Sequence, residues 1–317
     1  MKTLQFNNGD QMPVLGLGTW KSAPGDVYQA IKSALQIGYR HIDCAYIYGN
    51  EAEIGQALKE SFQEGVVTRE DLWITSKLWN SDHAPADVPQ GLAKSLSALQ
   101  LDYLDLYLMH WPVAIKEGIF FPESPDDLIP LIELPISETW EAMEKLVTNG
   151  ECKHIGVSNF SKTKLKTLCD SAKIKPEMNQ IEIHPYLQQP SMFDFCKSNS
   201  IHLTAYAPLG APDRPARIKA ADEPVLMEEP VIKAIAERHS ASPAQVLIRW
   251  AIHCGAAVIP KSINPVRIKQ NLIATDLELT QHDLLEINKL DRNRRYYTGG
   301  AWIIEGSPYT METLWDE

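Results

Sequence analysis

The sequence of 317 residues is poor in cysteine and lacks any long apolar run. Its five cysteines are odd in number and scattered, and no two form a C-x-x-C pair, which suits a reducing compartment better than a disulfide framework. No stretch approaches the roughly 18 consecutive apolar residues of a membrane-spanning helix, and the opening residues MKTLQFNNGD do not resemble a secretory signal. We therefore expect a cytoplasmic protein.

Positive charge is also scarce. The chain has 30 lysines and arginines against 41 acidic residues, so its formal net charge is −11 and its isoelectric point is about 5.3. Nucleic-acid phosphates are bound by concentrated basic side chains, so nucleic acid is disfavoured as the main partner. The contents of 44% hydrophobic and 22% charged residues are ordinary for a globular protein and argue against a disordered or fibrous class. We expect a folded, water-soluble protein.

The organisation of the chain is a short hairpin followed by repeated strand and helix units. The hairpin is indicated by the turn residues Asn8 and Gly9 between two short apolar pieces. Eight short apolar runs, each followed by an amphipathic stretch, occupy most of the remainder. The predicted strands are residues 14–18, 40–43, 72–77, 104–110, 154–158, 178–183, 202–207 and 257–260, and the predicted helices are 27–36, 51–64, 86–99, 138–148, 162–172, 191–198, 231–253 and 266–273.

The helical segments carry apolar stripes that need a sheet to cover. Ile54, Leu58 and Phe62 recur every four residues, as do Leu92 and Leu96. Strands that alternate with helices predict a parallel sheet, and eight units without a composition break favour closure into a barrel over an open two-domain sheet. The predicted fold is a single α/β domain over residues 1–317, a (β/α)8 barrel with an N-terminal hairpin.

Three long segments do not belong to the repeating units. They are residues 112–136, 209–229 and 293–317, and two of them follow predicted strands. In barrel enzymes the loops after the strands form the active-site face. We expect these segments to shape a binding site there, with tolerated surface insertions as the alternative.

Four chemistry-bearing side chains fall at or just past the ends of neighbouring predicted strands: Asp43, Tyr48, Lys77 and His110. Singly, such residues are more often a turn cap, a surface cation or a satisfied core group. Together they fit proton donation, because a nearby ammonium lowers the pKa of a phenol from its ordinary value of about 10. Asp43 would keep Lys77 charged, and His110 would hydrogen-bond a substrate carbonyl. We predict that these four residues are the catalytic centre.

Three segments resemble the signatures of the aldo-keto reductases. Residues 38–55, GYRHIDCAYIYGNEAEIG, match the leading signature, with Asp43 and Tyr48 at its catalytic positions. Residues 153–160, KHIGVSNF, match the second, and residues 259–271, IPKSINPVRIKQN, match the third. The resemblance spans nearly the whole chain. It implies a monomeric, NADPH-dependent reductase of aldehydes and ketones, in which a hydride passes to the carbonyl and Tyr48 donates the proton.

The resemblance also implies contacts with an extended NADP(H) molecule across the barrel mouth. At the nicotinamide end, the matching positions are the hydrogen-bonding residues Ser158, Asn159 and Gln180 and the stacking residue Tyr206. The matching positions around the 2′-phosphate are Lys261, Ser262, Asn264 and Arg267, where two cations and an adjacent helix N-terminus suit a phosphate. The remaining implied cofactor contacts are Gly18, Thr19, Trp20, Asp43, Pro208, Leu209, Gln270 and Asn271. Gln270 departs from the glutamate of many relatives, which weakens the implied adenine contact.

An apolar substrate pocket is implied by aromatic side chains that lie just past predicted strands. The implied substrate contacts are Trp20, Tyr46, Trp79, His110 and Trp111. Such a lining suits small aromatic or aliphatic carbonyl compounds. Buried core aromatics are the alternative for the four ring residues other than His110.

Three other functions fit the sequence less well. A Rossmann dehydrogenase is disfavoured because the early cluster LGLGTWK lacks the third glycine of G-x-G-x-x-G. A metal-dependent barrel hydrolase needs several ligands, and the EIHP run at residues 182–185 stands alone, so no metal is expected. A binding protein without turnover, as found among channel-associated subunits and lens components of this fold, is disfavoured by the intact set of Asp43, Tyr48, Lys77 and His110.

Overall fold

The fold is built around one parallel eight-stranded sheet. The computed structural model describes residues 2–215, 219–220 and 223–316. Each strand pairs with the next one along the barrel, in the order β3-β4-β5-β6-β9-β10-β11-β12. The strands are β3 (Leu17–Gly18), β4 (His41–Asp43), β5 (Trp73–Leu78), β6 (Leu104–Met109), β9 (Cys152–Ser158), β10 (Met178–Glu182), β11 (His202–Tyr206) and β12 (Ala257–Val258).

The two edges of this sheet meet and close it into a barrel. The Gly16 amide donates to the Val258 carbonyl at 2.8 Å, and the Gly18 amide donates to the Pro260 carbonyl at 3.3 Å. A Cβ atom at Gly18 would lie only 2.6 Å from the Ile259 carbonyl oxygen, so this close approach requires glycine. These contacts confirm the predicted (β/α)8 barrel.

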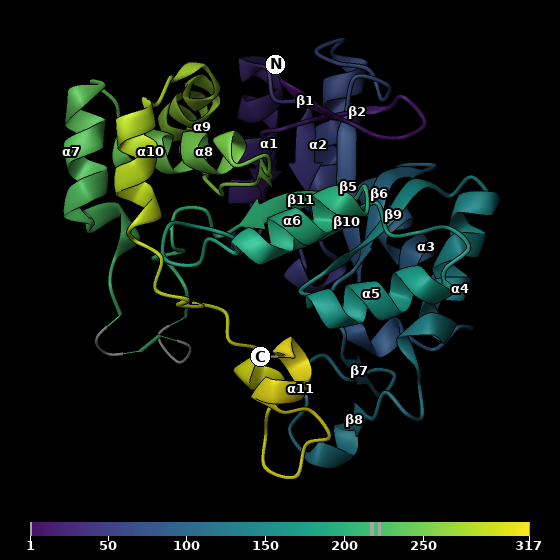
Figure 1. The fold of residues 1–317 in the computed structure, drawn as a ribbon. Helices are drawn as coiled ribbons and strands as arrows, with labels where there is room; N and C mark the ends of the chain where they lie inside the picture. Colours follow the sequence, from purple (N-terminus) through teal and green to yellow (C-terminus); the bar gives the residue numbers. More distant parts are fainter. Residues whose placement is uncertain (1, 216–218, 221–222, 317) are drawn as a thin grey trace.

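Helices surround the barrel and bury their apolar stripes against it (Figure 1). Ile54 and Leu58 are fully buried, as the periodicity predicts, and Phe62 packs against the same core. The helices that follow the strands are α1 (Asp26–Ile37), α2 (Glu51–Gln63), α3 (Val88–Leu99), α4 (Ile136–Thr148), α5 (Lys162–Ser171), α6 (Pro190–Ser198), α7 (Pro230–Arg238), α8 (Pro243–His253) and α9 (Pro265–Ile273).

The single helix predicted over residues 231–253 is wrong, because the chain breaks it into α7 and α8. Ser240 adopts a left-handed backbone with φ of 51°. Ser242 then caps α8 by accepting from the Gln245 amide, and Pro243 occupies the first helical position, where its missing N–H costs nothing. Helix α10 (Gln281–Asn288) is absent from the prediction because its eight residues contain only two buried apolar side chains.

The additions to the barrel lie at its two ends (Figure 1). The predicted hairpin is confirmed as β1 (Thr3–Gln5) paired antiparallel with β2 (Gln11–Pro13) at one end. At the other end, β7 (Ala114–Ile115) pairs with β8 (Leu128–Ile129), and this insertion packs with the C-terminal segment that carries α11 (Met311–Trp315). Two of the three long segments therefore meet at one end. Residues 216–218 and 221–222 of the third, and Glu317 of the tail, lie outside the described residues.

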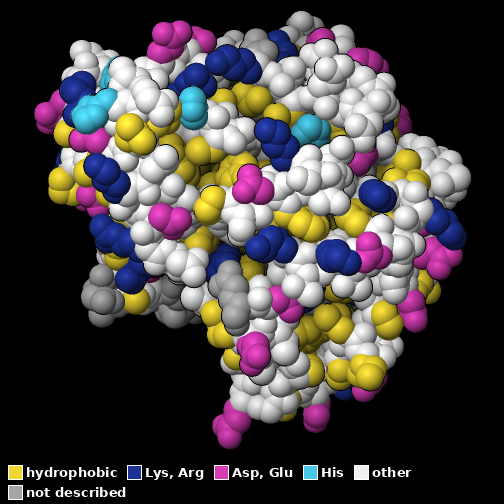
Figure 2. Space-filling view, viewed as in Figure 1, with side chains coloured by type: hydrophobic (Ala, Val, Ile, Leu, Met, Phe, Trp, Pro, Cys, Tyr) yellow, Lys and Arg dark blue, Asp and Glu magenta, His cyan; other side chains and the backbone are white. Residues whose placement is uncertain are grey.

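The surface is mixed in charge. Figure 2 shows Lys and Arg side chains interspersed with Asp and Glu over the visible face, without a continuous basic tract. Within the described ranges, every helix is too short or too polar to cross a membrane.

His154 in β9 fastens the hairpin to the barrel. Its Nδ1 lies 2.7 Å from Glu177 Oε2, and its Nε2 lies 3.0 Å from Asp10 Oδ2. The ring of Phe6 from the hairpin packs on His154 with centroids 4.4 Å apart. Burial alone would lower the pKa of His154, but the two carboxylates raise it above its ordinary value. The protonated imidazolium is therefore the form that the folded protein favours.

This raised pKa predicts a pH-dependent stability. The His154 contribution should be complete below about pH 6.5, the ordinary histidine pKa, and should be lost as the pH rises through the raised pKa of the folded state. We expect His154→Gln to lower the free energy of unfolding by roughly 1–3 kcal/mol near pH 6 and by less at pH 9. Urea denaturation across this range, with the exposed His282→Gln as control, measures the difference. A difference that does not change with pH would contradict the assignment.

Candidate active site

Four predicted residues come together at the ends of adjacent strands. Asp43 ends β4, Lys77 lies near the end of β5, and His110 directly follows β6. Tyr48 ends the short 3₁₀ helix η1 (Tyr46–Tyr48) after β4. Lys77 Nζ lies 2.7 Å from Asp43 Oδ2 and 3.4 Å from the Tyr48 hydroxyl, and the Tyr48 and His110 rings are 6.0 Å apart.

Lys77 is a buried cation with a complete set of partners. Its side chain is inaccessible to solvent, and its ammonium donates to Asp43 Oδ2, to the Cys44 carbonyl at 2.8 Å and to Tyr48. Burial opposes the charge, but the Asp43 carboxylate raises the pKa of Lys77 above its ordinary value. Lys77 is therefore charged at neutral pH, as the sequence predicts.

Both carboxylate oxygens of Asp43 and its backbone carbonyl accept hydrogen bonds. Its Oδ2 accepts from Lys77, its Oδ1 accepts from Gln180 Nε2 at 2.8 Å, and its backbone carbonyl accepts from Thr19 Oγ1 at 2.8 Å. These partners come from three different strands of the barrel or the residue just after one, namely β5, β10 and the residue that follows β3. The carboxylate is thus fixed in the orientation that Lys77 requires.

Tyr48 is neutral in the protein alone. Burial raises the pKa of its hydroxyl to about 12, although the ammonium of Lys77 acts in the opposite direction. The expected lowering below the ordinary value is therefore not met, because desolvation outweighs the neighbouring charge. The hydroxyl keeps its proton at neutral pH, and Lys77 favours the phenolate that would form if the proton were transferred.

His110 is also neutral. Burial lowers its pKa well below the ordinary value, and the charge of Lys77 adds to this effect. Its ring lies edge-on to Trp79, with centroids 5.3 Å apart, and its backbone carbonyl accepts from Asn159 Nδ2 at 2.9 Å. A neutral imidazole in an aromatic setting is suited to donate one hydrogen bond to a carbonyl oxygen.

The residues predicted for the nicotinamide end form one connected network. The Tyr206 hydroxyl donates to Asn159 Oδ1 at 2.7 Å, and Ser158 Oγ donates to the Gln180 carbonyl at 2.7 Å. Through Asn159 and Gln180 this network reaches His110 and Asp43. The predicted cofactor and catalytic residues therefore adjoin each other, at the ends of β9, β10 and β11.

The residues predicted for the 2′-phosphate lie at the start of α9. Asn264 caps this helix, and its Oδ1 accepts from the Val266 and Arg267 amides. Side chains rather than free amides would therefore contact a phosphate here. Arg267 is exposed and Lys261 is partly exposed, so a guanidinium and an ammonium are available to a phosphate at the start of α9. Gln270 is exposed and Asn271 is buried on the same helix.

The long segment after β11, which begins at residue 209, reaches the residues at the start of α9. Lys21, which follows β3, donates to the backbone carbonyl of Asp213, and Lys261 Nζ lies 3.6 Å from Asp213 Oδ2. Pro208 is buried and Leu209 is partly buried at the start of the segment. The segment therefore spans from β11 to the strand ends of β3 and β12.

Aromatic side chains line the approach to the four residues. Trp20 lies 6.4 Å from Tyr48, and Trp111 lies 5.8 Å from Trp302, between ring centroids. Trp79 Nε1 donates to the Phe120 carbonyl at 3.0 Å. These contacts bring the predicted ring residues, Tyr46 included, to the same end of the barrel.

Four further rings lie at this site: Phe120 and Phe121, which the sequence analysis missed, and Tyr297 and Trp302, which belong to the C-terminal segment expected to shape the site. Phe120 stacks on Tyr46, Phe121 stacks on Trp302, and Tyr297 lies edge-on to Trp20 and Tyr206. Phe120 and Phe121 remain 56% and 47% exposed, so they line the rim and not the core. A pair of phenylalanines in the polar run EGIFFPESPDD was the signal available.

Glu182 and His184, from the isolated EIHP run, bond to each other at 2.7 Å. Glu182 also accepts the backbone amides of Tyr296 and Tyr297 at 2.6 and 2.9 Å. The carboxylate thus anchors the C-terminal segment where it crosses the barrel end, and so places Tyr297 beside Trp20.

The buried Asp43 and Lys77 pair predicts a coupled loss of stability. Lys77→Met leaves a buried carboxylate without its cation and should lower the free energy of unfolding by about 3–5 kcal/mol. Adding Asp43→Asn should restore part of this loss, because the unpaired charge is removed. Urea denaturation of the single and double variants measures the coupling, and the exposed Lys166→Met serves as a control with a much smaller effect. Additive losses would contradict direct pairing.

Comparisons with known proteins identify the family of the chain. The model of the aldo/keto reductase family matches residues 14–292. An aldo/keto reductase of Synechocystis, slr0942, is 54% identical over 317 residues, which cover 100% of this chain and 97% of that protein. Human aldo-keto reductase family 1 member A1 is 48% identical over 293 residues, covering 92% of this chain and 90% of that protein.

A solved structure is similar as well. The aldose reductase from Schistosoma japonicum superimposes with a TM-score of 0.86 at 42% sequence identity, and the match covers 94% of this chain and 95% of that chain. The family model and these relatives together show that the chain belongs to the aldo/keto reductase family.

Proposed function

We propose that this protein is an NADPH-dependent reductase that converts aldehydes and ketones to alcohols. The observation that carries the proposal is the chain of contacts from buried Asp43 and Lys77 to partly buried Tyr48, with neutral His110 beside it. This arrangement places a proton donor, a charge that stabilises its conjugate base and a second hydrogen-bond donor around one point.

The residues that would hold NADP(H) form two groups. Ser158, Asn159, Gln180 and Tyr206 would contact the nicotinamide end, and they already adjoin the catalytic residues. Lys261, Ser262 and Arg267 would contact the 2′-phosphate, which suits the two cations and the hydroxyl at the start of α9. NADPH, when bound, supplies the hydride for the carbonyl carbon.

The roles of the protein groups follow from their protonation. Tyr48 keeps its proton until the carbonyl oxygen gains negative charge, and it then donates the proton to that oxygen. Lys77 stabilises the resulting phenolate, and Asp43 holds the ammonium in place. His110 would orient the carbonyl by donating a hydrogen bond to it. The rings of Trp20, Trp79 and Trp111 would exclude water and strengthen these interactions.

The proposed substrate class follows from the aromatic side chains that surround the candidate active site. Rings of Tyr46, Trp79, Trp111, Phe120 and Phe121 favour small aromatic or aliphatic carbonyl compounds. We further propose that residues 1–317 form one domain and that the protein acts as a cytoplasmic monomer.

Removal of the proton donor tests the proposed chemistry. Tyr48→Phe should reduce kcat by about 10²- to 10⁴-fold, the range of general acid catalysis, because the ring keeps its place and only the hydroxyl is lost. The Kd for NADPH, followed by cofactor fluorescence, should stay close to the wild-type value. Turnover above about a tenth of wild type, with chemistry rate-limiting, would show that Tyr48 is not the donor.

Cofactor choice should depend on Arg267. Charge-assisted hydrogen bonds are worth roughly 1.5–3 kcal/mol each, so Arg267→Ala should weaken NADPH binding by about ten-fold to over a hundred-fold and leave NADH nearly unaffected. The exposed Lys269→Ala on the same helix is the matched control. The effect should shrink in high salt, because the site is open to solvent. An equal loss for both cofactors in fluorescence titrations would contradict a phosphate contact.

A further inference from the structure

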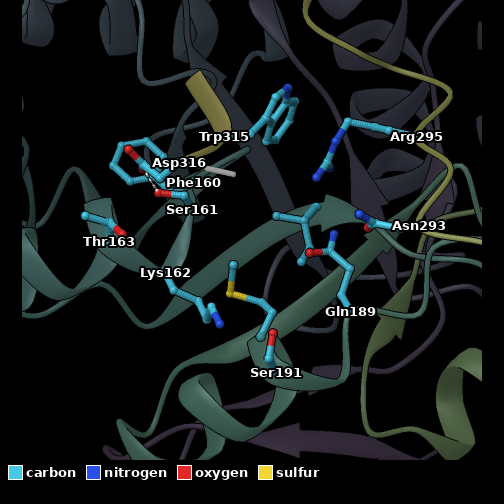
Figure 3. A pocket seen from close by; sticks show the side chains of 12 residues that line it. Phe160, Ser161, Lys162, Thr163, Gln189, Ser191, Asn293, Arg295, Trp315 and Asp316 are labelled. Carbon is cyan, nitrogen blue, oxygen red and sulfur yellow. Dashed lines mark hydrogen bonds between the residues drawn. The ribbon is translucent and has the colours of Figure 1, made fainter. Parts of the chain in front are cut away.

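Lys164 on α5, a partly buried cation, holds the end of the C-terminal segment. Its Nζ donates to the carbonyls of Thr313 and Leu314 at 2.6 and 3.2 Å and to Asp316 Oδ2 at 2.7 Å. The hydroxyl of Ser161, which caps α5, also donates to Asp316 (Figure 3). The Lys164 side chain is only 10% exposed, and its three donors are all engaged.

The held segment contributes Trp302 and Trp315 to a row of rings that also contains Trp79 and Trp111 and forms an aromatic wall. Trp315 lies 5.9 Å from Trp111, Trp111 lies 5.8 Å from Trp302, and Trp302 lies 5.7 Å from Trp79, between ring centroids. The Trp79 ring in turn contacts His110. A continuous row of rings therefore joins Trp315 to the catalytic centre.

Helix α11 cannot hold this position by itself. It has five residues, far fewer than the roughly 12–15 that an isolated helix needs in water. Trp315 also borders a cavity of about 300 Å³ lined by Phe160, Gln189 and Met192 (Figure 3). The ring has open space on this side, while its Nε1 donates to the Thr298 carbonyl at 2.9 Å and the Arg295 guanidinium lies 3.7 Å from its centroid. Lys164 adds the contacts that fix the residues on either side of Trp315, Leu314 and Asp316.

We propose that Lys164, together with Ser161 and Asp316, is a positioning group that fixes the aromatic wall and so determines how tightly bulky apolar carbonyl substrates bind. Lys164 acts through Trp315 and touches no reacting atom. This inference rests on the proposed reductase function for its substrate readout, but the contact itself is testable without turnover.

The first test measures substrate selectivity in Lys164→Met, which keeps the length of the side chain and removes its charge. The KM for a bulky aromatic aldehyde such as 2-naphthaldehyde should rise about tenfold, the effect of losing roughly one charge-assisted hydrogen bond, while kcat and the KM for propanal change little. Lys164→Arg should recover most of the loss. Lys166→Met is the matched control, since Lys166 is exposed on the same helix and pairs only locally with Asp170.

The second test is hydrogen exchange of the backbone amides of α11 in the full chain with NADPH present. Exchange should be faster in Lys164→Met and in Asp316→Asn, and unchanged in Lys166→Met. Asp316→Asn keeps the second test decisive if Lys164→Met folds poorly, because Asp316 lies closer to the surface.

The outcomes separate the two proposals. Unchanged α11 exchange and an unchanged ratio of the two KM values would overturn the role of Lys164 while leaving the reductase proposal intact. A wild-type protein that reduces neither aldehyde, but whose α11 exchange responds to Lys164→Met, would overturn the reductase proposal and leave only the structural contact. A uniform rise in KM for both aldehydes would also overturn the selectivity role.

Discussion

The ammonium of Lys77 is the group on which the rest of the site depends. A lysine inside a barrel is unfavourable unless every proton has an acceptor and a carboxylate balances the charge. The barrel meets this requirement because adjacent parallel strands end side by side, so Asp43 and Lys77 project toward the same point. Gln180, from across the barrel, then fixes the carboxylate. Catalytic geometry here is a consequence of stabilising one buried cation.

The barrel and its additions make different contributions to the site. Three of the four candidate catalytic residues, Asp43, Lys77 and His110, lie on strands or directly after them, and Tyr48 ends the short helix η1. The rings that surround a substrate come largely from the insertion after β6 and from the C-terminal segment, which have little secondary structure of their own. The candidate catalytic residues and the surrounding rings are therefore supported by separate elements, and the second can vary without disturbing the first.

Much of the fold could be predicted from the sequence, because alternation of apolar runs and amphipathic stretches reports directly on a βα barrel. Asp43, Lys77 and His110 could be placed together because strand ends of a parallel sheet share one face. The break at Ser240 is signalled by the run HSASP, in which Ser242 caps a helix and Pro243 takes its first position, but the prediction joined the apolar stripes on the two sides of this run into one helix. The neutral state of Tyr48 was out of reach, because the balance between burial and the charge of Lys77 depends on packing that no local pattern encodes. The contacts of Lys164 join residues far apart in sequence and leave no local signal.

The seam between β3 and β12 links assembly of the fold to the residues at the start of α9. Its hydrogen bonds join the first and last strands of the barrel, so they are the contacts of greatest sequence separation in the sheet and among the most costly in chain entropy to form. Gly18 pairs there with Lys261, which lies shortly before α9. A chain that has not closed its barrel cannot present these residues in their final positions. The side chains at the start of α9 thus depend for their placement on a contact that joins the two ends of the barrel.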